Sequence, residues 1–165
     1  MGMYTEFVMA VNLRSNTPNT VIDILKFMIG ERETPPIGLG GHPLFQTERW
    51  SIMLRCDSAY FAGDTHSTLL KRKYRVGNSY DLTIRCNLKN YDSEIEQFLD
   101  WIIPYIDDTY DGFIGYMRCE EFDDPTLIYF DWYSSGYPIQ LMKIVDGEIC
   151  EKRPLISCLG LERSL

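Results

Sequence analysis

Two histidines are the chain's only imidazole groups, and each lies in a segment rich in glycine, proline and small polar residues, residues 30–48 and 57–66. With nearby aspartates they could supply a general base or bind a divalent metal, because imidazole and carboxylate groups serve both purposes. No HxH or HExxH spacing joins them. A small enzyme or ligand-binding protein with its site between these loops is therefore the alternative hypothesis. Its candidate catalytic side chains are His42, His66, Asp57 and Asp64.

Other motifs for catalysis or cofactor binding are incomplete. The sequence has no GxSxG nucleophile motif, and the glycine run 38–41 lacks the lysine of a phosphate-binding loop. Residues 107–112 resemble the start of a calcium loop, but Arg118 stands where the bidentate glutamate is required. We therefore expect no metal and no other cofactor, and a protein that is not an enzyme.

The five cysteines predict a reducing environment. Their number is odd and no CxxC pair is present, so we expect free thiols and a cytoplasmic protein. No apolar run approaches 18 residues, which argues against a membrane-spanning helix and a membrane partner. Residues 1–11 lack the basic region of a secretory signal.

Negative charge is concentrated in the second half of the 165 residues. The whole chain has a net charge of −8, and residues 92–131 hold twelve carboxylates against Arg118 alone, a net charge of −11. Such a field repels phosphate backbones and attracts cations. We therefore expect no direct nucleic-acid binding through this half and favour a basic protein surface as the partner. The alternative is that the acidic residues only keep the protein soluble.

The same half carries tyrosines in an alternating pattern. In two predicted strands, residues 112–120 and 126–133, one face is apolar and the other carries tyrosine with charged residues. Tyrosine and arginine on a rigid, exposed sheet favour partner recognition. The alternative is that these rings are ordinary half-buried sheet residues. The candidate partner-binding side chains are Tyr116, Arg118, Glu120, Tyr129, Asp131 and Tyr133.

The register of these two strands follows from burial. Pairing Gly115 with Trp132 and Met117 with Phe130 collects the apolar residues on one face, and glycine would leave room for the indole. Further on, Asp146-Gly147 predicts a tight hairpin turn within residues 142–150.

Hydrophobic periodicity places the remaining strands and the first helix. Alternation predicts strands over 4–13 and 79–88, and strands are also expected over 49–56 and 67–76. A helix should follow Thr17 as N-cap, with Pro18 as its first residue, and end at Gly30.

A second helix is predicted after residue 92. Ser93 and Glu96 have the spacing of a capping box, and the apolar residues that follow recur at helical spacing up to Ile106. Pro104 falls opposite this apolar stripe, where it would bend the helix or end it at Ile103.

These elements predict an α+β single domain over residues 1–165. The expected order is β-α-β-β-β-α-β-β plus a C-terminal hairpin, with a mostly antiparallel sheet and two helices on one face. We expect a small acidic protein-interaction module, of inhibitor, immunity or adaptor type. A homodimer, with one sheet face buried across a two-fold axis, is a further possibility.

Overall fold

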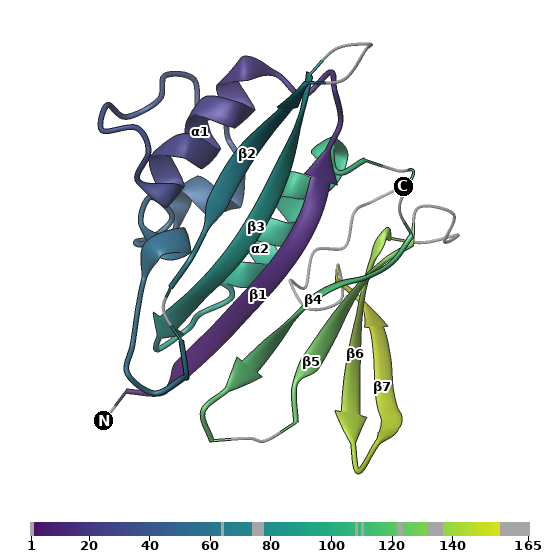
Figure 1. The fold of residues 1–165 in the computed structure, drawn as a ribbon. Coiled ribbons are helices and arrows are strands. Elements are labelled where there is room, and N and C mark those ends of the chain that lie inside the picture. Colours follow the sequence, from purple (N-terminus) through teal and green to yellow (C-terminus); the bar gives the residue numbers. More distant parts are fainter. Residues whose placement is uncertain are drawn as a thin grey trace.

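An antiparallel sheet of seven strands organises the chain in the computed structural model (Figure 1). The strands are β1 (Tyr4–Leu13), β2 (Thr68–Lys73), β3 (Asn78–Lys89), β4 (Gly112–Cys119), β5 (Thr126–Phe130), β6 (Ile139–Val145) and β7 (Glu148–Pro154). Their order across the sheet is β2-β3-β1-β4-β5-β6-β7, so the first strand lies in the interior of the sheet. The structure describes residues 2–63, 65–73, 78–107, 109, 111–121, 124–131 and 137–155.

Two α-helices, α1 (Asn19–Ile29) and α2 (Glu94–Ile102), lie on the same side of the β2-β3-β1 part of the sheet (Figure 1). Phe7 on β1 meets Phe98 on α2 with ring centroids 6.1 Å apart, and both side chains are fully buried. The side of the sheet that faces the helices is called the inner face below, and the opposite side the outer face. None of the described helices is long and apolar enough to cross a bilayer.

The α+β class is confirmed, but the predicted element order is not. Residues 49–56 form no strand and instead contain the short 3₁₀ helix η2 (Met53–Arg55). Met53 and Leu54 are neighbours and both are fully buried, whereas a strand would turn only one of them inward. Two further 3₁₀ helices are η1 (Pro43–Gln46) and η3 (Ile103–Tyr105), and Pro104 lies in η3 directly after α2 ends.

The end of α1 is as predicted, whereas its cap is not. Gly30 adopts a left-handed conformation with φ of 86° and ends the helix. Thr17 does not cap the helix, because its hydroxyl donates to the carbonyl of Arg14 at 2.7 Å.

The capping box predicted for α2 is absent. The hydroxyl of Ser93 donates to the carbonyl of Asp92, and Ser93 itself has a left-handed φ of 60°. Glu96 is buried and does not reach back to the helix start. The neighbouring Glu94 instead accepts the amide proton of Asp92 at 2.6 Å.

The predicted register of β4 and β5 is wrong by four residues at Gly115, Tyr116 and Met117, where the predicted faces are right, and by five at Gly112 and Phe113. Gly115 pairs with Ile128, and the register shifts between Phe113 and Gly115. Because four is an even number, Ile128 and Phe130 still point to the buried side. The glycine is needed for a different reason. A Cβ on it would lie 2.0 Å from the carbonyl oxygen of Val8 on the adjacent β1. Trp132 lies outside the described residues.

The two edges of the sheet carry charged side chains. The predicted tight hairpin joins β6 and β7 through Asp146 and Gly147, both with positive φ. At the opposite edge, β2 ends with three exposed basic residues, Lys71, Arg72 and Lys73. On β7, the exposed charged residues are Glu148, Glu151 and Lys152.

Candidate interaction surface

The imidazole of His42 is held at both ring nitrogens. Its Nδ1 accepts the amide proton of Leu44 at 3.1 Å, so Nε2 carries the proton and donates to Asp100 Oδ2 at 2.8 Å. His42 thereby caps η1 and ties the loop 30–48 to α2. A ring with both nitrogens engaged is a structural tie and leaves no lone pair for a general base.

The other candidate catalytic residues are not brought to His42. His66 is exposed, and its backbone amide donates to the carbonyl of Arg85 on β3. The carboxylate of Asp57 accepts from the hydroxyl of Thr65 at 2.9 Å, and Asp64 lies outside the described residues. Within the described part of the chain, no hydrogen bond or ion pair joins the two histidines. The same part holds no group of three His, Cys, Asp or Glu residues that could bind a metal.

The predicted tyrosine-bearing face is the outer face of β4 and β5. Tyr116, Tyr129 and Asp131 are half-buried there, and Tyr133 lies outside the described residues. Burial raises the pKa of Tyr116, and the nearby carboxylate of Glu6 raises it further. The hydroxyl of Tyr116 therefore stays neutral.

Arg118, expected on this surface, binds an internal carboxylate. Its Nη2 lies 2.8 Å from Oε2 of Glu6, which is fully buried and stands opposite Arg118 in the β1–β4 register. Arg85 on β3 approaches the other oxygen of Glu6 at 3.3 Å. The sequence places Glu6 on the polar side of β1 but gives no signal of its burial.

Residues 57–63, here called the strap, cover this cluster on the outer face. Tyr60 stacks on Tyr4 with ring centroids 4.8 Å apart, and the guanidinium of Arg118 lies 5.0 Å from the ring centre of Phe61. Arg85 donates to the carbonyl of Ala62. The irregular segment predicted from its glycine and small residues therefore occupies part of the predicted recognition face.

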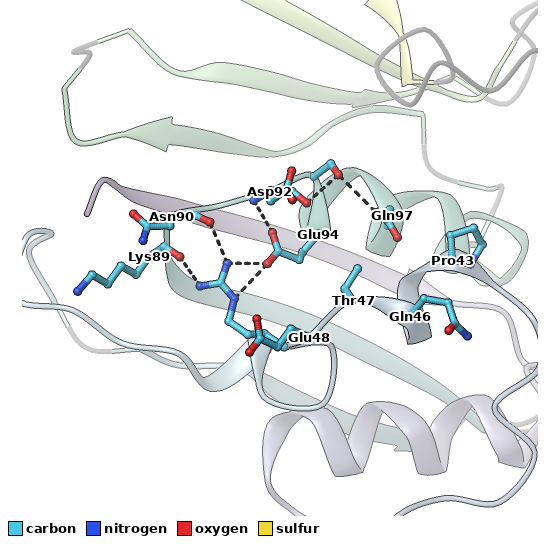
Figure 2. Close-up of a pocket in the computed structure, with 11 residues that line it drawn as sticks. Pro43, Gln46, Thr47, Glu48, Lys89, Asn90, Asp92, Glu94 and Gln97 are labelled. Carbon is cyan, nitrogen blue, oxygen red and sulfur yellow. Dashed lines mark hydrogen bonds and ion pairs between the residues drawn. The ribbon is translucent and has the colours of Figure 1, made fainter. Parts of the chain in front are cut away.

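A groove of about 760 Å³ opens on another part of the molecule, between residues 43–49, the end of β3 and the start of α2 (Figure 2). In Figure 2, Gln46 and Thr47 lie across from Glu94 and Gln97. Its volume is in the range of ligand-binding clefts, but such clefts are mainly apolar and this one is lined by polar side chains. The lining residues are Pro43, Gln46, Thr47, Glu48, Arg49, Lys89, Asn90, Asp92, Ser93, Glu94 and Gln97.

The positive charge of Arg49 in this groove is neutralised. Its Nη2 lies 2.5 Å from Oε1 of Glu94, and its guanidinium also donates to the carbonyls of Lys89 and Asn90. Burial alone would raise the pKa of Glu94, but hydrogen bonds from Arg49 and from a backbone amide hold it below its usual value. The pair is fixed inside the groove wall, and nothing in the sequence pattern predicted it.

Three exposed carboxylates, Asp92, Glu121 and Asp124, follow the ends of β3 and β4, the two strands that flank β1, and are called the acidic end. The amide of Asn90 donates to Met3 at 2.6 Å and that of Glu120 to Tyr4 at 3.0 Å, which puts both turns beside the start of β1. None of the three carboxylates has an ion-pair partner among the described residues. Lys89 at the end of β3 is an exposed cation, and its Nζ lies 5.9 Å from the Tyr4 ring centre.

No known protein family, curated protein or solved structure matches this chain.

Proposed function

We propose that the protein is an interaction module that binds a positively charged protein surface through its acidic C-terminal half. The observation that carries this proposal is that the only basic residue of the acidic segment forms its ion pair outside that segment. Arg118, the only basic residue of 92–131, is bound by Glu6 from outside that segment. The carboxylates of the acidic end are left uncompensated at the surface, where they attract cations over distances of about a Debye length, roughly 10 Å at 0.1 M salt.

The groove beside the acidic end gives such a partner a recess. Arg49 is neutralised by Glu94, which leaves the exposed carboxylates of Glu48 and Asp92 at the rim. The oxygens of side-chain amide and hydroxyl groups in the lining can accept hydrogen bonds from a lysine or arginine side chain. In this proposal Tyr116 and Tyr129 extend the contact along the outer face.

The free thiols fit a reducing compartment, and the proposal includes a cytoplasmic location. Cys56, Cys86, Cys119 and Cys150 are unpaired among the described residues.

Binding of a defined basic peptide tests the proposal. A fluorescent lysine- and arginine-rich peptide should bind the protein, and its Kd should rise at least tenfold between about 0.05 M and about 0.3 M salt. An acidic peptide of the same length should not bind. Binding that is absent, or indifferent to salt, would contradict the electrostatic proposal.

Two variants that each lose three negative charges distinguish the effect of the acidic end from the effect of the protein's net charge. Replacing Asp92, Glu121 and Asp124 by their amides removes three charges from the acidic end, and we expect at least a tenfold weaker affinity. The control replaces Glu31, Glu33 and Asp111, which are exposed and belong to other segments (Asp111 precedes β4, at the opposite end of that strand from Glu121), and removes the same number of charges. Equal losses in the two variants would show that only net charge matters and that the acidic end is not the binding surface.

A further inference from the structure

Buried polar atoms without hydrogen-bond partners gather beneath the strap. They are Oε1 of Glu6, Oδ1 of Asn87, Nε of Arg118 and Oε2 of Glu120. The register sets Asn87 and Arg118 on either side of Glu6, and Glu120 is tied to Tyr4 through its other oxygen at 3.1 Å. Buried polar groups are normally hydrogen-bonded, so a concentration of four in one place calls for a physical explanation.

Charge imbalance does not explain them. The carboxylates of Glu6 and Glu120 are matched by the guanidinium groups of Arg85 and Arg118, so an added cation or anion would leave the cluster with a net charge. What the four atoms lack is hydrogen-bond partners, and water supplies those without adding charge.

The strap that keeps this cluster covered is only locally attached. Its one buried apolar side chain, Phe61, is not part of the hydrophobic core that includes both helices. Beyond that ring, the strap holds to the sheet through the Tyr60–Tyr4 stack and the bond from Arg85 to Ala62. The hydroxyl of Thr65 donates to the carbonyl of Cys56 and to the carboxylate of Asp57, at the base of the strap, and these bonds can persist when residues 58–63 lift.

We propose that the strap is a lid that opens locally, without unfolding of the sheet, and admits water to the Glu6 cluster. Opening loses the burial of Phe61, but it gives water as a partner to Asn87, Arg118 and Glu120 and to the Glu6 oxygen that has only the 3.3 Å contact with Arg85, which offsets part of that loss. The open state uncovers Tyr4, Glu6 and Arg118 on the outer face, and a partner that binds there would hold the strap open. This conformational equilibrium does not depend on the charge-driven function proposed above.

Amide hydrogen exchange on the full chain, followed by mass spectrometry or NMR, tests the lid. The amides of residues 59–63 should exchange at least a hundredfold faster than those of β1 and β3, with a rate that hardly changes in low denaturant. Such independence marks local opening, since global unfolding is steeply denaturant-dependent. Exchange of the strap only through global unfolding, at the rate of the core strands, would overturn the proposal.

A substitution in the strap itself gives a second, independent measurement. Phe61→Ala should raise strap exchange roughly tenfold or more, because the ring's burial is the main barrier to opening, and should leave exchange in β3 unchanged. The control is Phe113→Ala, which truncates a 45% exposed ring near the start of β4, whereas the strap packs on Arg118 near the end of that strand. Unchanged strap exchange in Phe61→Ala, or an equal rise in the control, would show that the strap is not a lid closed by Phe61.

Discussion

Glu6 and Arg118 stand opposite each other on β1 and β4, and one guanidinium nitrogen of Arg118 lies 2.8 Å from the fully buried carboxylate of Glu6. An isolated carboxylate in this position would carry a large desolvation penalty. The pair therefore joins the helix-covered strands to the β4–β7 part of the sheet through electrostatics as well as backbone hydrogen bonds.

Removing Arg118 should leave the buried carboxylate of Glu6 with only the longer contact to Arg85, at 3.3 Å. We expect Arg118→Met to lower the free energy of unfolding by about 2–3 kcal/mol, below the usual range for buried pairs because Arg118 is partly exposed. Urea unfolding followed by circular dichroism measures this. Arg72→Met is the control, since its pair with Asp81 on the outer face is exposed and its loss should change stability by less than about 1 kcal/mol. Equal effects would mean that Glu6 does not depend on Arg118.

Gly115 should tolerate no side chain. A Cβ there would overlap the backbone of Val8, so we expect Gly115→Ala to destabilise the fold by about 3 kcal/mol or more. Gly41→Ala is the matched control, because nothing lies within 4 Å of its Cβ position and its φ is not positive. Thermal unfolding compares the two, and a tolerated Gly115→Ala would show that β1 and β4 can separate without cost.

Two glutamates of α2 should affect stability in opposite directions. Burial raises the pKa of Glu96, so its contribution favours the folded state below the usual glutamate value of 4.5 and is lost as the pH rises through the raised pKa. The pKa of Glu94 is lowered by Arg49 and a backbone amide, so its contribution is present above 4.5 and is lost as the pH falls through the lowered value.

At pH 7 we therefore expect Glu96→Gln to raise the free energy of unfolding by about 1 kcal/mol and Glu94→Gln to lower it by about 2 kcal/mol. The gain in Glu96→Gln should disappear as the pH falls toward 4.5, and the loss in Glu94→Gln should shrink only below that value. Urea unfolding at a series of pH values measures both, and shifts of the same sign would contradict the assignment.

Thiol labelling should distinguish the cysteines by burial. Cys150 is exposed on β7. The pKa of the Cys86 thiol is raised, mainly by desolvation on burial and further by the nearby Cys56 and Glu6. We expect a maleimide at neutral pH to modify Cys150 within minutes and Cys86 only as the protein unfolds. Mass spectrometry of digested samples identifies the sites, and rapid native labelling of Cys86 would show that the inner face is open to solvent.

Periodicity predicted the elements whose burial alternates regularly. On β1 and β3, every second side chain is buried, and the sequence shows that pattern directly. Residues 49–56 also looked like a strand, but tertiary packing buries the adjacent Met53 and Leu54 and favours a 3₁₀ turn. From Gly115 onward the register error is four residues and keeps the faces correct, because burial specifies only even or odd pairing. The irregularity before Gly115 adds one residue and places Phe113 beside Tyr129.

The site residues were harder to predict because they depend on contacts between distant segments. Arg118 and Glu6 are 112 residues apart, and Arg49 and Glu94 are 45 apart. A single sequence shows that each is charged but not which charge it meets. His42 depends on a distant contact in the same way, since its ring meets Asp100, 58 residues further along the chain, as well as the neighbouring Leu44.

The basic residues of β2, at one edge of the sheet, act against edge-to-edge pairing between two copies of the protein. Two copies meeting along β2 would bring Lys71, Arg72 and Lys73 of each close to the same residues of the other, with no carboxylate on that strand to separate them. Strand edges that repel their own copies discourage the stacking that leads to fibrils. Pairing of two copies through β2 is therefore disfavoured, and the free hydrogen-bonding groups of this edge are left to water.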